Sequence, residues 1–157
     1  MQFYRKYFRV KNIDILVYRM SEPKPIDVAD IGMKIQTVEL SGKKSFSIKE
    51  SGKLVHNSFL FKKAHVLRLL GKKGPVIGDC VTSPEYRGRS IYPFVINKIA
   101  LESLKEGHKE VFVIVNSGNQ ASIRGIEKAG FHQFAHVKAK RFLFFYFGLD
   151  IQKSFLG

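Results

Sequence analysis

The segment from Val76 to Tyr92 limits the possible folds of this chain more than any other segment. It reads as an apolar strand from Val76 to Val81, a tight turn at Pro84 and the start of a helix. Arg87, Gly88 and Arg89 form the entry to that helix. Backbone N–H groups at a helix N-terminus, with fixed positive charge beside them, favour the binding of an anion such as a phosphate.

The residues that follow predict a second strand and a second helix. The first helix is expected over Ser90–Glu106, with Pro93 tolerated in its first turn. Val111–Val115 is a continuous apolar run, which is typical of a strand covered on both faces. Asn119–Ala129 predicts a shorter helix that stops at Gly130. A right-handed crossover would place both strands in one sheet, with the ligand beyond their carboxyl ends.

The first half of the chain is rich in aromatic and β-branched residues and reads as strands. The expected strands are 3–8, 13–18, 35–40, 46–48 and 54–61, with turns at 41–44 and 50–53. This spacing predicts an antiparallel meander.

Four further segments complete the secondary structure that the sequence predicts. Ala64–Leu70 fits a helix or a strand, and we favour a strand. Ile26–Met33 is a short helix candidate. Phe131–Lys138 and Arg141–Phe147 are expected to close the fold as two strands.

Composition narrows the class of protein. The chain has 157 residues, 45% of them hydrophobic, which fits one globular domain. Its only cysteine, Cys80, excludes an intramolecular disulfide and is expected to be a small buried apolar residue. The five histidines show no metal-ligand spacing, so no metal is expected. The N-terminus is too polar for a signal peptide and no apolar run approaches the roughly 20 residues of a membrane span, so we expect a soluble cytoplasmic protein.

The two strand–helix motifs together resemble the acetyl-CoA motifs of the GNAT superfamily of N-acetyltransferases. In that family a strand is followed by Arg or Gln, two residues, Gly, one residue, and Gly or Ala. Here Arg87 leads the motif, and Ser90 and Tyr92 stand at the two positions where the family has small residues. The second motif, Asn119–Ser122 followed by Gly130–Phe131, has the family's spacing. The arrangement around Tyr86–Pro93 also looks like small enzymes that acylate amino sugars during polysaccharide synthesis.

The resemblance implies a fold and an activity. The fold class is α/β (α+β), with a mixed, mostly antiparallel GNAT-like sheet flanked by helices and an atypical strand-rich N-terminal half. Residues 1–157 would form a single acyl-CoA-binding domain, with the cofactor half at about 74–131. The activity would be transfer of an acetyl group from acetyl-CoA, as co-substrate, to a primary amine by direct attack in a ternary complex.

The resemblance also implies cofactor contacts. The backbone of Cys80, Val81 and Thr82 would pair with the pantetheine arm, and an N–H near Val81 would polarise the thioester carbonyl. The pyrophosphate would lie on Arg87, Gly88, Arg89, Ser90, Ile91 and Tyr92. Asn119 and Ser122 would contact the cofactor arm.

The catalytic acid and base are not evident from the sequence. The position of the family's usual tyrosine acid holds Ile126, and that of its frequent glutamate base holds Val76. The remaining candidates are His56, as an imidazole base, and Asp79 and Tyr92, near the expected thioester.

The net charge of +14 leaves the partner open. Such a field attracts phosphorylated small molecules, nucleic acid and anionic membranes alike. The acceptor is expected to be a small-molecule amine, such as an amino sugar on a phosphorylated nucleotide carrier, while an amino acid, an antibiotic or a protein amine would suit the same chemistry. The alternative is a module without catalysis that binds nucleic acid through Phe3–Arg9 and Lys138–Phe142, or a membrane surface through Lys138–Lys153. Nucleic acid is the less favoured partner, and a peripheral membrane contact and a dimer both stay open.

Overall fold

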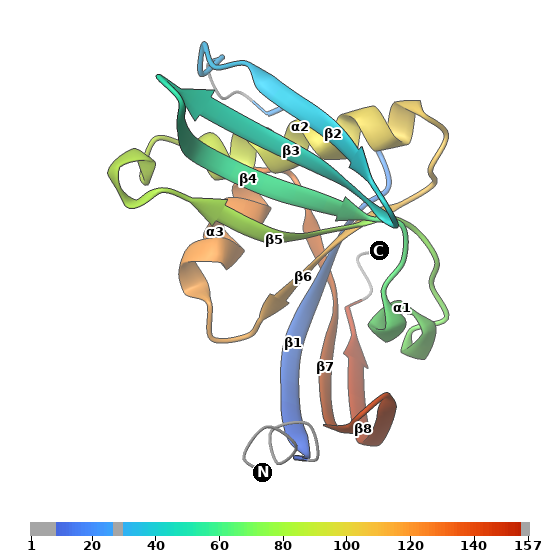
Figure 1. Cartoon of the computed structure of the whole chain (residues 1–157). Coiled ribbons are helices and arrows are strands. Elements are labelled where there is room, and N and C mark those ends of the chain that lie inside the picture. Colours follow the sequence, from blue (N-terminus) through green and yellow to red (C-terminus); the bar gives the residue numbers. More distant parts are fainter. Residues whose placement is uncertain (1–8, 27–29, 155–157) are drawn as a thin grey trace.

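A computed structural model describes residues 9–26 and 30–154. In these residues the helices are α1 (His65–Leu69), α2 (Ile91–Lys105) and α3 (Gln120–Lys128), with a 3₁₀ turn at Pro84–Tyr86. The strands are β1 (Lys11–Met20), β2 (Ile35–Leu40), β3 (Lys43–Glu50), β4 (Lys53–Phe61), β5 (Val76–Thr82), β6 (Val111–Asn116), β7 (His132–Phe142) and β8 (Phe145–Lys153). They form one sheet in the order β2-β3-β4-β5-β6-β1-β7-β8 (Figure 1).

The predicted mixed, mostly antiparallel α/β fold is confirmed. Every neighbouring pair of strands in the described sheet is antiparallel except β5 and β6, which are parallel and joined through α2. The expected meander is confirmed for β2, β3 and β4, but its extension back to the strand over residues 13–18 is wrong. That strand is part of β1, which lies between β6 and β7. Both faces of β1 carry buried side chains, Val17 and Tyr18, which suits a central position in the sheet.

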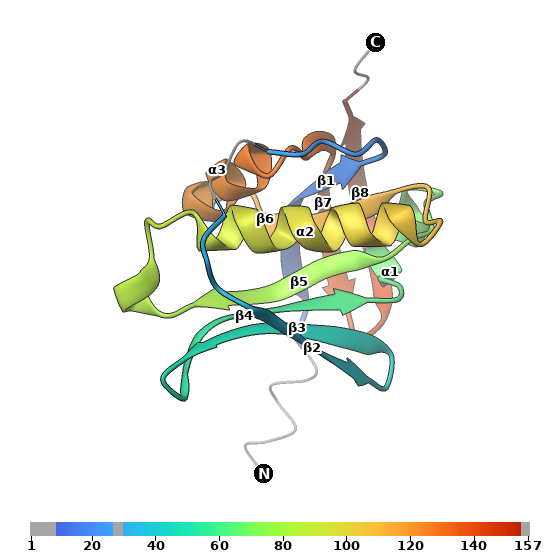
Figure 2. The ribbon, with the colours of Figure 1, turned by 90° about the horizontal axis from the view of Figure 1, so that it is seen from above.

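The sheet is covered by helices on both faces (Figures 1 and 2). On one face, Ile91, Val95 and Ile99 of α2 recur at helical spacing and pack in one core cluster with residues of β5, β6 and α3. On the other face, α1 contributes Val66 and Leu67 to a second cluster around β1, β6 and β7. Among the described residues no helix is both long enough and apolar enough to cross a bilayer.

The strand favoured for Ala64–Leu70 is wrong, because residues 65–69 form α1. Val66, Leu67 and Leu70 are all buried, and their spacing places them on one side of a helical turn. A short apolar run does not distinguish a helix from a strand, and here the packing against the sheet decides the outcome.

The last two strands differ from the prediction in their boundary. The expected break at residues 139–140 lies instead at Leu143 and Phe144, where Leu143 has a φ of 53°. Ala139 is buried and continues β7, and no Gly or Pro marks the true turn. Two other predictions fall wholly or partly outside the described residues: the strand at 3–8, and the helix at Ile26–Met33, whose described residues are not helical.

Asn97 ties the cofactor half of the chain to the segment after β1. Its side-chain amide on α2 donates to the carbonyls of Lys24, at 2.7 Å, and Ala129, at 2.9 Å. Asn97 is buried, and Ala129 is fully buried.

We predict that Asn97→Ala lowers the free energy of unfolding by about 2 kcal/mol, because the carbonyls lose their donor in the core. Urea denaturation measures the change. Asn12→Ala, at an exposed strand position, is the control and should change stability by less than about 0.5 kcal/mol. Equal stability of the two variants would contradict the assigned role of Asn97.

Candidate functional site

The parallel strands β5 and β6 separate soon after they meet. They pair only at Val76 with Phe112 and at Ile77 with Val113, and then diverge toward the left of Figure 1. In the pairing of β4 with β5, a single residue, Ser58, lies opposite both Asp79 and Cys80. The strand β5 therefore has one residue more than β4 at this point, which is a β-bulge. A bulge bends the strand that contains it.

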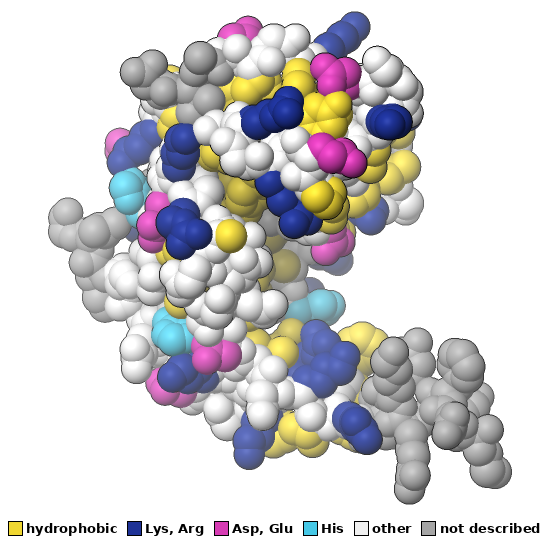
Figure 3. Space-filling model, turned by 90° about the vertical axis from the view of Figure 1, so that its left-hand side faces the viewer, with side chains coloured by type: hydrophobic (Ala, Val, Ile, Leu, Met, Phe, Trp, Pro, Cys, Tyr) yellow, Lys and Arg dark blue, Asp and Glu magenta, His cyan; other side chains and the backbone are white. Residues whose placement is uncertain are grey.

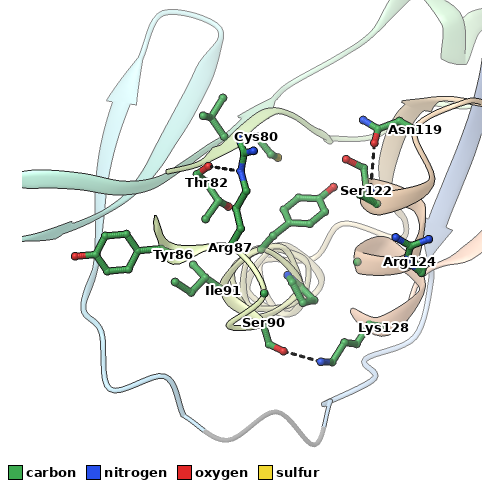
Figure 4. A pocket seen from close by; sticks show the side chains of 16 residues that line it. Cys80, Thr82, Tyr86, Arg87, Ser90, Ile91, Asn119, Ser122, Arg124 and Lys128 are labelled. Atoms are coloured by element: carbon green, nitrogen blue, oxygen red, sulfur yellow. Dashed lines mark hydrogen bonds between the residues drawn. The ribbon is translucent and has the colours of Figure 1, made fainter. Parts of the chain in front are cut away.

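A cavity of about 690 Å³ lies beside the diverging end of β5 (Figure 4). It is lined by the end of β5, by the loop and first turn of α2, and by one side of α3. The cofactor-binding residues predicted from the sequence that line it are Cys80, Val81, Thr82, Arg87, Gly88, Ser90, Ile91, Tyr92, Asn119 and Ser122. Arg89 is not in the lining, and its guanidinium lies 5.0 Å from the centre of the Tyr86 ring.

The backbone amides at the start of α2 are unpaired. The N–H groups of residues 88 to 92 donate to no other described residue, and the first hydrogen bond of the helix runs from Phe94 N to Ser90 O. Positive φ angles at Gly88, 76°, and Ser90, 59°, bend this stretch into the alternating conformation of an anion-binding nest. Unpaired N–H groups and the helix dipole together favour a negative charge here.

The side chains around the cavity add positive charge and no negative charge. Arg87, Arg124 and Lys128 line it, while the lining contains no Asp or Glu. The Arg87 Nε donates to the Thr82 carbonyl at 3.1 Å, and the Lys128 Nζ donates to the Ser90 hydroxyl at 2.6 Å (Figure 4). These contacts hold two of the cations at opposite sides of the α2 N-terminus.

Sequence reasoning missed one side of the cavity. Tyr86, Pro93, Ala121, Arg124, Gly125 and Lys128 line it but were not predicted. Four of them lie on α3 at positions 121, 124, 125 and 128, a spacing of three, four and seven residues that marks one helix face. Asn119 caps the start of this helix, and its Oδ1 accepts a hydrogen bond from Ser122 N at 3.2 Å. The helical repeat counted from this cap places these four residues on one face, and this is the signal for them in the sequence.

Ser90 departs from the family motif at a position where the backbone favours glycine. Its φ of 59° and ψ of 18° are in the left-handed region. That conformation costs a residue with a Cβ about 1–2 kcal/mol. The Ser90 hydroxyl offsets part of this strain through the contact with Lys128, which joins the start of α2 to the end of α3.

Tyr92, the second departure from the motif, is accommodated by a glycine on α3. A Cβ placed on Gly125 would lie 2.6 Å from Cδ1 of the Tyr92 ring, which is closer than atoms pack. Burial raises the pKa of the Tyr92 hydroxyl well above its usual range, so the phenol is neutral at physiological pH. The space needed for the large side chain is therefore supplied from the facing helix.

The other catalytic candidates lie outside the cavity lining. His56 is fully buried, with Nδ1 2.7 Å from the Thr82 hydroxyl and Nε2 2.7 Å from the Ser58 hydroxyl. Burial lowers the pKa of His56 to about 4. Asp79 is exposed at the bulge, with a φ of 50°. Val76 and Ile126 are core residues, so the two family positions that they occupy contain no titratable group.

Cys80 lines the cavity with a neutral thiol. Its Sγ donates to the Gly78 carbonyl at 3.6 Å, and burial raises its pKa to about 11. A thiol that stays protonated is a poor nucleophile. In the described part of the chain, no group of three or more His, Cys, Asp or Glu side chains is placed to hold a metal ion.

The fold is similar to those of solved structures assigned to the GNAT family, although no protein-family model and no curated protein matches the sequence. A protein of Novosphingobium aromaticivorans assigned to the GNAT family of acetyltransferases superposes with a TM-score of 0.63, at 17% identity, over 94% of this chain and 68% of that one. A GNAT-family acetyltransferase from Colwellia psychrerythraea superposes with a TM-score of 0.55, at 16% identity, over 80% of this chain. This chain spans 54% of the length of the Colwellia protein. The chain thus has a GNAT-like fold.

We predict that the effect of Gly125→Ala on stability depends on Tyr92. In the wild-type background the new methyl group overlaps the Tyr92 ring, and the free energy of unfolding should fall by about 1–3 kcal/mol. In a Tyr92→Ala background the clash is absent, and alanine should stabilise α3 by up to about 1 kcal/mol relative to glycine. A double-mutant cycle in urea measures the coupling, and additive effects would contradict the contact.

We predict that His56 makes the fold sensitive to mild acid. The unfolded chain binds a proton at His56 near its ordinary pKa of 6.5, whereas the folded chain binds it only near a pKa of about 4. Stability is therefore complete above pH 6.5 and is lost as the pH falls toward 4, by about 2 kcal/mol between pH 7 and pH 5. His56→Gln keeps hydrogen-bonding groups at this position but does not titrate between pH 7 and pH 5. The loss of about 2 kcal/mol that His56 causes over this range should therefore be absent from the variant. An unchanged pH profile would show that His56 is solvated in the folded protein.

Proposed function

We propose that this protein is an acetyltransferase that transfers an acetyl group from acetyl-CoA to a primary amine. One observation carries the proposal. The unpaired amides of residues 88–92 open onto a cavity that is lined by Arg87, Arg124 and Lys128 and lies beside the free edge of β5. Helix amides and cations suit the pyrophosphate of coenzyme A, and a strand edge suits its amide-containing arm. The GNAT-like fold is consistent with this assignment.

Each chemical part of the proposed cofactor has a candidate partner around the cavity. The pyrophosphate would lie on the start of α2, held by the amides of residues 88–92 and by Arg87 and Lys128. The arm would run along β5 past Cys80 and Thr82, where β6 has moved away. The acetyl group would then lie near the bulge at Asp79, and a backbone N–H near Val81 would stabilise the oxygen of the thioester as it gains charge.

In the proposed reaction the amine attacks the thioester directly. The lone pair of the amine nitrogen forms the new C–N bond, the C–S bond breaks, and the electron pair leaves on the sulfur of coenzyme A. The proton lost by the nitrogen balances the proton gained by the thiolate, and water carries it. His56 is enclosed and neutral at physiological pH, so it is not in place to take this proton directly.

The acceptor amine would bind as the free base. The cavity lining contains no Asp, Glu or His that could take a proton from an ammonium group. An acceptor that binds already deprotonated needs no such group. No strong protein base is then required.

We propose an amino sugar, carried on a nucleotide, as the acceptor class. The net charge of +14 would attract a phosphorylated acceptor as well as the phosphorylated cofactor. Release of free coenzyme A thiol, followed with a thiol-reactive dye, should be fastest with a nucleotide-linked amino sugar in a panel that also holds a free amino sugar, an amino acid and a lysine peptide. A faster reaction with the peptide would move the acceptor to protein amines and leave the cofactor assignment standing.

We predict that Arg87→Ala weakens acetyl-CoA binding by about tenfold or more, because a charged hydrogen-bond donor to the phosphates is lost. Arg89→Ala is the matched control, because the Arg89 side chain is not part of the cavity lining, and the acetyl-CoA affinity of this variant should change much less. Isothermal titration calorimetry with acetyl-CoA, coenzyme A and a short DNA duplex, at low and moderate salt, measures both.

Three results would count against the proposal. Equal effects of the two substitutions would show that general charge, and not the cavity, attracts the cofactor. Acetyl-CoA affinity that is unchanged in Arg87→Ala would show that the loop is misassigned. Salt-sensitive DNA binding without acetyl-CoA binding would point instead to a nucleic-acid module.

A further inference from the structure

The tip of the β7–β8 hairpin concentrates exposed apolar side chains. Among the described residues, the large hydrophobic side chains that are exposed at this tip are Leu143, Phe144, Phe145, Phe147 and Leu149. Phe144 is 84% exposed and Phe145 is 73% exposed. Val10, also exposed, directly precedes Lys11, which pairs with Arg141 of the hairpin. Contiguous exposed apolar surface of this kind marks an interaction site.

The hairpin extends away from the rest of the fold. In Figure 1 the turn between β7 and β8 lies at the lower end of the molecule, while α2 lies at the upper end. In Figure 3, Lys and Arg side chains lie next to hydrophobic ones at this lower end. The tip is thus free of the helices that cover the body of the sheet.

Positive charge surrounds the apolar tip. Lys140 lies opposite Phe147, Arg141 lies opposite Tyr146, and Lys11 lies opposite Arg141 on the neighbouring strand. None of these three cations makes an ion pair with a described residue. From Lys140 to Leu149 the sequence contains no Asp or Glu. The tip therefore combines an apolar end with a basic collar.

We propose that this hairpin docks the protein on an anionic lipid surface. Phenylalanine and leucine side chains would enter the interface between headgroups and acyl chains, and Lys11, Lys140 and Arg141 would contact the anionic headgroups. The charges favour this partner over a second copy of the chain, because two tips in contact would oppose cations with no acidic residue between them. The aliphatic members, Val10, Leu143 and Leu149, offer no surface on which nucleic-acid bases stack. The inference stands independently of the proposed acetyl transfer.

A tryptophan probe tests the docking directly, because the chain has no tryptophan of its own. Phe144→Trp places the only indole at the tip, and its fluorescence should shift to the blue and increase when vesicles of phosphatidylserine and phosphatidylcholine are added. Val38→Trp is the matched control. Val38 is an exposed apolar residue on β2, at the opposite edge of the sheet, and its emission should not change.

Charge and apolar variants separate the two parts of the surface. In vesicle co-sedimentation, Lys140→Glu with Arg141→Glu should weaken binding to anionic vesicles by about tenfold or more. Phe144→Ser with Phe145→Ser should do the same, while the melting temperature stays within a few degrees because the altered side chains are exposed. Lys49→Glu with Val38→Ser, also at exposed positions, should bind like the wild type.

Several outcomes would overturn the proposal. If the wild type does not bind anionic vesicles, or binds vesicles of phosphatidylcholine alone equally well, the proposal is contradicted. Unchanged vesicle binding by both double variants of the hairpin contradicts it too. A concentration-dependent dimer that the Phe144→Ser, Phe145→Ser variant abolishes, without vesicle binding, would assign the tip to a second copy instead. A blue shift of the indole in the Phe144→Trp variant on adding DNA but not vesicles would assign the tip to nucleic acid.

Discussion

Beyond Ile77 the strand β5 loses its partner β6, and the candidate site depends on this separation. The bulge at Asp79 and Cys80 bends β5 while β4 continues to hold its other edge. The freed edge of β5, the unpaired amides of residues 88–92 and the lining face of α3 then border one cavity. If β5 and β6 stayed paired along their full lengths, the edge would be closed and no arm of a cofactor could lie along it.

The two departures from the family motif have separate compensations in the structure. Ser90 adopts a backbone conformation that favours glycine, and its hydroxyl accepts a hydrogen bond from Lys128. Tyr92 needs space on the neighbouring helix, and Gly125 supplies it. Both compensations come from α3, so the start of α2 and the face of α3 form a single unit. The effect of a substitution at Ser90 or Tyr92 should therefore depend on the residue that it contacts on α3.

Basic side chains, which give the chain its net charge of +14, gather at two surfaces whose surroundings differ. Around the cavity, Arg87, Arg124 and Lys128 face polar groups and unpaired amides. At the β7–β8 hairpin, Lys140 and Arg141 border exposed phenylalanines. The first surroundings suit a phosphate held by directed hydrogen bonds, and the second suit a lipid surface, where apolar burial and headgroup attraction act together.

The sequence by itself determined the features that depend on residues close in the chain. These include the strand–turn–helix of residues 76–92, the cap at Asn119 and the doubly covered strand β6, since periodicity, glycine and capping act over a few residues. It also identified most of the cavity lining through the family resemblance. Only the tertiary structure decided the place of β1 within the sheet, the helical state of residues 65–69, the bulge at Asp79 and the approach of Arg124 and Lys128 to the α2 N-terminus. Each of these depends on contacts between segments far apart in the chain, where packing, and not local preference, selects the conformation.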